Sequence, residues 1–134
     1  MSLFNSLDVA GSGIDAAQTW LNTTAGNIAN MNDVGPMDEA AYGAQTPVFV
    51  PTSTPGQVGS GVTVTGIAEG DTTGIVQFDP NSPVADAHGD VRVPDVQLAS
   101  QMVNMIQAQT DFQANTSVFA DAKTAYQAAL TLGT

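Results

Sequence analysis

The most regular pattern of apolar and polar positions in this sequence runs from Val96 to Leu132. Its positions are spaced alternately four and three residues apart, which is the heptad repeat of a helix that packs against other helices. The repeat consists of Leu98, Met102, Met105, Gln109, Phe112, Thr116, Phe119, Lys123, Tyr126 and Leu130. One of its two columns begins at Leu98, recurs every seven residues to Tyr126, and is apolar throughout. We therefore predict a long helix over residues 96–132.

A second apolar stripe follows the last turns of this predicted helix, formed by Val118, Ala122, Ala125, Ala129 and Leu132. At about 100° per residue, the two stripes lie roughly a quarter-turn apart, so the end of the helix is apolar over a wide face. One partner helix would not cover such a face. The alternative is a helix buried in the chain's own core, but a chain of 134 residues has little other sequence to cover it.

The beginning of the chain, from Leu3 to Asn30, is also predicted to be a helix. Its apolar positions again alternate in steps of four and three, with one slip before the last: Leu3, Leu7, Ala10, Ile14, Ala17, Leu21, Ala25 and Ile28. Each of the three glycines inside it makes helix formation about 1 kcal/mol less favourable than an alanine would. Burial of Leu7, Ile14 and Leu21 at about 1.5–3 kcal/mol each would outweigh them, so we expect this helix to become ordered when it docks.

Residues 33–94 contain strand and turn signals in place of helical ones. We predict strands over residues 46–50, 62–67 and 74–78, which together would form one small sheet, and an irregular segment over residues 79–94. Pro47 and Pro51 indicate an edge strand. The fold class is therefore α+β, with a coiled-coil-like pair of long terminal helices (residues 1–32 and 95–134) and a small irregular β-rich region (residues 33–94) between them.

Polar and aromatic residues near the helices give further expectations. Ser2 and Asp95 are suited to be N-caps of the two helices, and Gly133 suits the position after the second helix. Trp20 lies one position before Leu21, off the apolar repeat. It either covers the edge of the helix pair or makes an assembly contact, because tryptophan is enriched at interfaces.

The charge of the chain restricts its partners. Thirteen acidic and two basic residues give a net charge of −11, which argues against nucleic acid and anionic lipid, since both require clustered lysine and arginine. The charge fits either solubility before assembly or a saline habitat. No stretch approaches the roughly 18 apolar residues of a membrane span. The start of the sequence has no signal-peptide pattern, so we expect any export to use a route that reads no cleaved leader.

No pattern in the sequence predicts a catalytic, cofactor-binding or metal-binding site. The sequence has no cysteine, and His88 is its one histidine. His88 lies between Asp86 and Asp90, a spacing that matches no metal site of known geometry, and a solvated turn histidine is the simpler interpretation. Calcium could use oxygen ligands from Asp79, Asn81, Asp86 and Asp90, but the EF-hand pattern is absent.

Lys123 is unusual because it falls on the predicted helix seam and has no acidic residue four positions before or after it. In the simpler interpretation its stem lies along apolar surface while its amine stays in water. In the other, it forms an ion pair with an aspartate of another segment, Asp8 or Asp15, or of a neighbouring subunit.

Several segments resemble the bacterial flagellar rod, hook and related axial proteins. The resemblance begins at residues 6–12 (SLDVAGS) and is most specific at residues 25–30 (AGNIAN). It continues through residues 47–49 and 61–67, through residues 79–96 (DPNSPVADAHGDVRVPDV), and through residues 102–106 and 112–115. The segment at residues 79–96 is similar to the one that marks the proximal rod member of this family. The resemblance covers nearly the whole chain in order.

The resemblance implies a structural subunit that is not an enzyme and that is located in the periplasmic rod of the basal body. It implies export in an unfolded state through the flagellar type III apparatus, followed by helical assembly into the tube that transmits torque. The implied partners are the chain itself, other proximal and distal rod subunits, the adaptor between the rod and the MS ring, and the export apparatus, without membrane insertion. The expected packing set is Leu7, Ile14, Leu21, Ile28, Met102, Met105, Phe112, Phe119, Tyr126 and Leu130, with Lys123 as a candidate ion-pair residue.

Two other function classes stay open from the residues alone. One is a secreted acidic binding module, with the loop from Asp79 to Asp95 as its site and calcium as a candidate ligand. The other is an enzyme that uses His88 and its neighbouring aspartates. Both would be compact monomers that unfold cooperatively, whereas a rod subunit alone should have frayed ends and become ordered with its partners.

Overall fold

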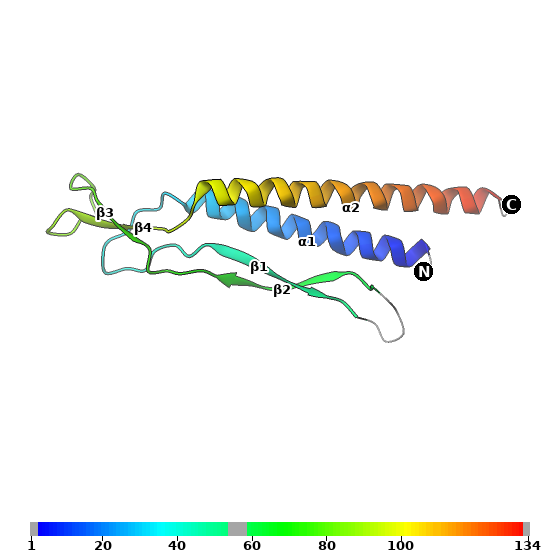
Figure 1. The fold of residues 1–134 in the computed structure, drawn as a ribbon, viewed down its shortest axis with the longest axis horizontal. Helices are drawn as coiled ribbons and strands as arrows, with labels where there is room; N and C mark the ends of the chain where they lie inside the picture. Colours follow the sequence, from blue (N-terminus) through cyan, green and yellow to red (C-terminus); the bar gives the residue numbers. More distant parts are fainter. Residues whose placement is uncertain (1–2, 54–58, 133–134) are drawn as a thin grey trace.

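The computed structural model describes residues 3–53 and 59–132, and it has the α+β fold that the sequence predicts. Two helices, α1 (Leu3–Asn30) and α2 (Leu98–Leu132), enclose four strands in the chain order. The strands are β1 (Gln45–Pro51), β2 (Val62–Glu69), β3 (Ile75–Phe78) and β4 (Asp90–Val93). The molecule is elongated: α1 and α2 run antiparallel side by side, and α1 lies between α2 and the hairpin of β1 and β2 (Figure 1).

The start of α2 differs slightly from the prediction. The amide of Gln101 donates to the carbonyl of Gln97 at 3.1 Å, so Gln97 occupies the N-cap position. The expectation that Asp95 caps this helix is therefore wrong, because the helix begins two residues later than the pattern of apolar residues indicated. The expected caps Ser2 and Gly133 lie outside the described residues.

The strands form two separate two-stranded antiparallel sheets, whereas we expected one small sheet. β1 pairs with β2 from Gln45 opposite Glu69 to Pro51 opposite Val62, with a register shift between Val48 and Phe49. Every strand of a two-stranded sheet is an edge strand, which is why prolines are tolerated at both positions in β1. β3 pairs with β4, a strand of four residues that lies inside the segment predicted to be irregular.

The buried stripe of α1 follows the predicted repeat except near its end. Ala10 and Ala17 are buried, as the repeat predicts, and Thr24 is only 2% exposed. Ala25, the predicted position, is exposed. The repeat therefore continues from Leu21 through Thr24 to Ile28 without a slip. The apolar pattern does not reveal this continuation, because the seam position is a threonine.

The seam of α2 uses one predicted column and one different column. Three contacts place its inner face against α1: Gln101 bonds Asn27, Asn115 covers Gly13, and the ring of Tyr126 meets that of Phe4 at 5.1 Å. The buried or half-buried positions on this face are Gln101, Met105, Ala108, Phe112, Asn115, Ala122 and Tyr126. The other predicted column is exposed, and it consists of Met102, Gln109, Thr116, Lys123 and Leu130.

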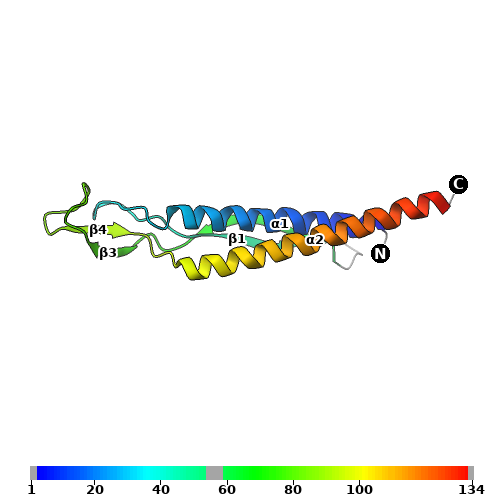
Figure 2. The same ribbon diagram turned by 90° about the horizontal axis from the view of Figure 1, so that it is seen from above.

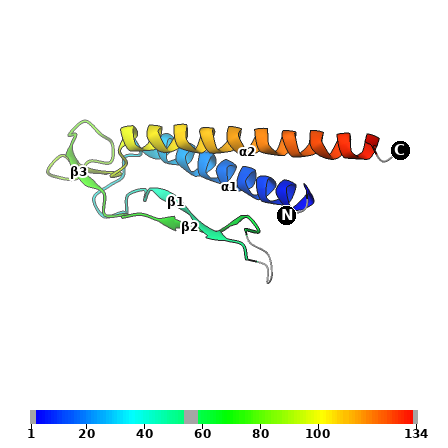
Figure 3. The ribbon, with the colours of Figure 1, turned by 45° about the vertical axis from the view of Figure 1, so that its right-hand side comes forward.

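The interior of the single chain is thin. Among the described residues, the buried apolar side chains are Val91 and five alanines, and the largest fully buried side chains are Val91 and Thr24. Many large apolar side chains are exposed in both the helices and the strands. In addition, the C-terminal turns of α2 extend past the N-terminal end of α1 (Figures 2 and 3). The fold therefore positions two helices without enclosing their outer surfaces.

Candidate functional site

Asn27 is the polar centre of the helix pair and is only 2% exposed. Its Nδ2 donates to the carbonyl of Gln45 at 2.8 Å and to Oε1 of Gln101 at 3.0 Å. Its Oδ1 accepts from the amide of Gln45 at 2.7 Å and from the hydroxyl of Tyr42 at 2.9 Å. One side chain thus joins α1 to α2 and to the start of β1, and all four of its hydrogen-bonding positions are used.

Gly13 allows α2 to approach α1 closely. A Cβ atom at this position would lie 2.6–2.8 Å from the side-chain amide of Asn115, which is too close for real contacts. Asn115 Nδ2 in turn donates to the carbonyl of Asp111 at 2.9 Å, which orients this amide over the glycine. The glycine that weakens α1 as an isolated helix therefore has a packing role.

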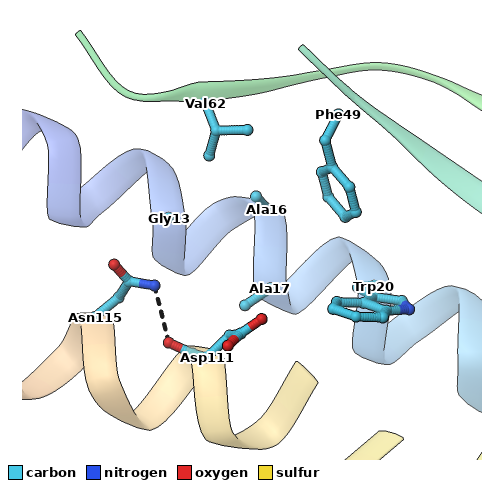
Figure 4. Close-up of a pocket in the computed structure, with 8 residues that line it drawn as sticks. All are labelled: Gly13, Ala16, Ala17, Trp20, Phe49, Val62, Asp111 and Asn115. Carbon is cyan, nitrogen blue, oxygen red and sulfur yellow. Dashed lines mark hydrogen bonds between the residues drawn. The ribbon is translucent and has the colours of Figure 1, made fainter. Parts of the chain in front are cut away.

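An open groove of about 230 Å³ lies where α1, α2 and the first hairpin meet (Figure 4). The rings of Trp20 and Phe49 form one side of it, with centroids 5.9 Å apart and planes at 65°. Trp20 therefore packs against β1, an intrachain partner that the sequence did not indicate. The groove is lined by Gly13, Ala16, Ala17, Trp20, Phe49, Val62, Asp111 and Asn115.

The hairpin of β1 and β2 is fixed to α1 at two points. Near one end, the hydroxyl of Ser12 accepts from the amide of Val62 at 3.1 Å and donates to the carbonyl of Val9 at 2.8 Å. Gly61 makes this approach possible, since its φ of +109° and its closeness to Ser12 leave no room for a side chain. At the other end the hairpin is held by the bonds between Asn27 and Gln45. Neither anchor could be predicted from apolar patterning, because both involve polar residues.

The predicted packing residues divide between two environments. Seven are half-buried in the single chain, namely Leu7, Ile14, Leu21, Ile28, Met105, Phe112 and Tyr126. Three are exposed: Phe119 at 38%, Met102 at 52% and Leu130 at 55%. Whether neighbouring subunits cover either group remains a prediction.

The two basic residues have different surroundings. Arg92 is engaged inside the chain, because its Nη1 donates to the carbonyl of Thr73 and its Nη2 to that of Met37, both at 2.8 Å. Lys123 is exposed, and its ion pair with Asp8 or Asp15 stays a prediction. An ion pair between Lys123 and a neighbouring subunit is still a prediction.

The acidic segment before α2 forms tight turns. The amides of Asp90 and His88 donate to Oδ1 of Asp86 at 2.9 and 2.8 Å, and these bonds hold the pKa of this exposed carboxylate below its ordinary value. The side-chain hydroxyl and the amide of Thr73 lower the pKa of Asp71 in the same way. Hydrogen bonds to the charged form therefore stabilise both turns.

The part of the chain that the structure describes contains no cluster of three or more acidic, histidine or cysteine side chains that could hold a metal ion. Neither of its two helices combines the length and the apolar character that a membrane span requires.

Comparisons with known proteins give consistent results over the whole chain. The family model described as flagella basal body rod protein matches residues 7–36, and the model described as flagellar basal body rod FlgEFG protein C-terminal matches residues 89–132. The chain is 40% identical to the flagellar basal-body rod protein FlgC of Yersinia enterocolitica and 37% identical to that of Salmonella typhimurium, over 99% of each chain. The protein of the same name from Aquifex aeolicus is 32% identical over 95% of this chain and 94% of its own.

Proposed function

Because the chain belongs to the FlgC family of flagellar basal-body rod proteins and is a structural subunit of the basal-body rod, we propose that its helices are completed by neighbouring subunits. The observation that carries this proposal is the contrast between interior and surface. Among the residues that the structure describes, alanines dominate the buried apolar positions, while seventeen large apolar side chains are exposed in the single chain. Exposed apolar area on this scale is typical of association surfaces.

We further propose that the chain occupies the proximal part of the rod and contacts other copies of itself, other rod subunits and the adaptor between the rod and the MS ring. Its role is mechanical and involves no catalysis: the packed helices transmit torque. Residues 1–32 and 95–134 act as the axial helices, and residues 33–94 set the spacing to outer neighbours. The secreted binding module has no support from the comparisons.

We also propose that the chain passes through the flagellar type III export apparatus unfolded and that its helices become fully ordered when it docks. Gly11, Gly13 and Gly26 lower the intrinsic stability of α1, so its helix depends on packing. Folding on docking would supply that packing from the neighbours as well as from α2.

The decisive experiment is complementation of a strain that lacks its own rod protein of this family, followed by imaging of purified basal bodies. The chain should restore swimming and give density in the rod. Met105→Asp places a charge on the face of α2 toward α1 and should abolish rod incorporation, whereas Gln113→Asp, an exposed position on the same helix, should leave it intact. Absence of the chain from basal bodies of swimming cells would disprove the proposal.

Lys123 gives a narrower test of assembly. If its amine pairs with a carboxylate of a neighbouring subunit, Lys123→Met should reduce the amount of chain in basal bodies, and Lys123→Arg should preserve it. Equal amounts in all three would remove this ion pair from the proposal, because methionine retains the stem but not the charge.

A further inference from the structure

β3 is an edge strand at the end of the molecule that lies beyond the helix pair (Figure 1). It pairs with β4, and it contacts no other helix or strand of the described chain. All four of its residues are exposed, and Ile75, Val76 and Phe78 are 50%, 57% and 69% exposed. The residues of β4 are all buried or half-buried. β3 is therefore an apolar strand with one edge that the described residues leave open.

The hydrogen bonds of β4 show which backbone groups of β3 face the open edge. The amide and the carbonyl of Arg92 bond to Gly35 at 2.9 Å, so they point away from β3. Val76 lies opposite Arg92 in the antiparallel pair. Residues opposite each other either bond to each other or both point outward, so the amide and carbonyl of Val76 point to the open edge. Those of Phe78, two residues further on, point the same way.

The exposed apolar side chains of β3 lie on both of its faces. Side chains alternate along a strand, so Ile75 projects to one face and Val76 and Phe78 to the other. A helix that packs on one face would leave the other uncovered. A strand that pairs with the open edge would place side chains beside both faces and would bond the outward backbone groups. The arrangement therefore favours an added strand.

The charge around β3 indicates the chemistry of that strand. Residues 70–90 contain four aspartates and no lysine or arginine. Asp71 precedes β3, Asp79 follows it directly, and Asp90 lies opposite Phe78 in the pair with β4. A segment that carries lysine or arginine beside its apolar residues is complementary to this edge, whereas an acidic segment would be repelled.

A second copy of this chain offers no such segment. Its two basic residues are Arg92, whose guanidinium bonds two carbonyls of its own chain, and Lys123, which lies in α2. Two β3 edges that met would also bring their aspartates together. The hairpin of β1 and β2 differs from this edge, because residues 40–68 contain no charged side chain and charge selects no partner there.

We propose that the open edge of β3 pairs with an extended segment of a different protein that combines apolar residues with lysine or arginine. This inference rests on the proposed function, because it names the class of outer neighbour that residues 33–94 contact. The added strand bonds the backbone of Val76 and Phe78, covers their side chains, and places its cations beside Asp79 and Asp90.

Photo-crosslinking in basal bodies tests this contact. Phe78 is replaced by p-benzoyl-phenylalanine in the full chain, which is produced in cells that lack their own copy, and basal bodies are irradiated and purified. We expect an adduct with a different protein, in which the joined peptide contains lysine or arginine. A joined peptide from a second copy of this chain, a joined peptide without basic residues, or an adduct with lipid only would overturn the proposal.

Two further variants test the backbone pairing. Val76→Pro removes the amide that points to the open edge and leaves the bonds to β4 in place, whereas Val76→Thr keeps that amide. The adduct, measured per copy of the chain in basal bodies, should be lost in Val76→Pro and kept in Val76→Thr. Equal yields from the two variants would show that no strand is added.

A titration tests the charge and does not depend on assembly. A short synthetic peptide of alternating lysine and valine is added to the purified chain, and a glutamate and valine peptide is the control. Only the lysine peptide should bind, about fivefold more weakly when Asp79→Asn and Asp90→Asn are combined. Asp15→Asn with Asp121→Asn, two exposed helix positions, should leave its affinity unchanged. Equal binding of both peptides, or binding of neither, would contradict the proposal.

The readouts also separate this inference from the proposed function. If the chain is present in basal bodies and the cells swim, but position 78 gives no protein adduct, the contact at β3 is wrong and the rod function stands. If even the unsubstituted chain neither restores swimming nor enters basal bodies, the proposed function itself fails.

Discussion

Asn27 illustrates how a single polar residue can set the geometry of an apolar helix pair. It forms four hydrogen bonds that reach α2, β1 and the connection between α1 and β1. A seam of small apolar residues would allow α1 to slide along α2, whereas a buried side-chain amide makes all of its hydrogen bonds in only one register of the two helices. We therefore interpret Asn27 as the residue that fixes the register of α1 against α2.

Replacement of this residue has a measurable expected cost. Asn27→Ala would leave the amide of Gln45 and the side chain of Gln101 without their partner, which should lower the free energy of unfolding by about 2–3 kcal/mol. Urea denaturation of the purified chain measures this difference. Asn22→Ala, at an exposed position of the same helix, should change it by less than about 0.5 kcal/mol. Similar losses in both variants would refute the role of Asn27.

The turn at Asp86 should respond to acid in one direction. Its carboxylate has a pKa below the ordinary value because the amides of Asp90 and His88 bond to the charged form. The stabilisation is therefore complete above the ordinary pKa of about 4 and is lost as the pH falls through the lower pKa of the folded turn.

Amide hydrogen exchange at Asp90 and His88, corrected for the intrinsic pH dependence, measures this effect. Protection should fall in acid in the unsubstituted chain. In Asp86→Asn it should be independent of pH over the same range, because the amide oxygen accepts these bonds and does not titrate. Protection that stays constant through acid in the unsubstituted chain would show that these bonds do not stabilise the turn.

At the level of elements, the sequence predicted both helices and three strands, and it failed where seam positions are polar or small. The predicted column from Met105 to Tyr126 faces α1, but its companion column is formed by Gln101, Ala108, Asn115 and Ala122. Hydrophobicity alone favoured Met102 and Leu130 for that column. The close approach over Gly13 selects small and hydrogen-bonding residues, a preference that no apolar pattern can reveal.

β4 was missed for a different reason. Its four residues, Asp90–Val93, have too few alternating positions to distinguish a strand from a loop. Its pairing is set by tertiary contacts: Val91 is fully buried, and the backbone of Arg92 bonds to that of Gly35 at 2.9 Å in both directions. For the same reason the separation into two sheets could not be predicted, because strand partners depend on where the connections lie.

The glycines of α1 give a prediction for this helix as an element. Apart from its chain neighbours and the backbone of α1 itself, no described atom lies within 4 Å of a Cβ built on Gly11, so Gly11→Ala should stabilise the chain by about 1 kcal/mol through helix propensity. Gly13→Ala should gain less or lose stability, since its Cβ would meet the amide of Asn115. Thermal or urea unfolding of the two variants measures the difference. Equal stabilisation by both would show that Asn115 can move away without cost.

For the whole molecule, charge is distributed very unevenly. Nine of the thirteen acidic residues lie between positions 31 and 97, where Arg92 is the one basic residue, which gives this region a net charge of −8. The two helices together carry a net charge of only −3. None of these nine lies in residues 40–68, so the end of the molecule that carries β3 and β4 (Figure 1) is strongly acidic, while the helices are nearly neutral and expose apolar surface. This division favours assembly through the helices.

The same division makes the assembly of this chain dependent on salt. When subunits pack through their helices, their acidic ends come closer together, and the repulsion between them extends over a Debye length of about 30 Å at 0.01 M but only about 8 Å at 0.15 M ionic strength. Self-association of the purified chain, measured by sedimentation, should therefore strengthen from low to moderate NaCl concentration.

A combined Asp38→Asn and Glu39→Gln variant, which removes two exposed charges of the β-rich region, should associate at lower salt. A control variant with Asp15→Asn and Asp111→Asn removes the same amount of charge from the helices. Comparison of the two variants therefore separates the effect of the position of the charges from the effect of the net charge. Association that weakens as salt is added would mean that attractive ion pairs, and not apolar contacts between nearly neutral helices, hold the subunits together.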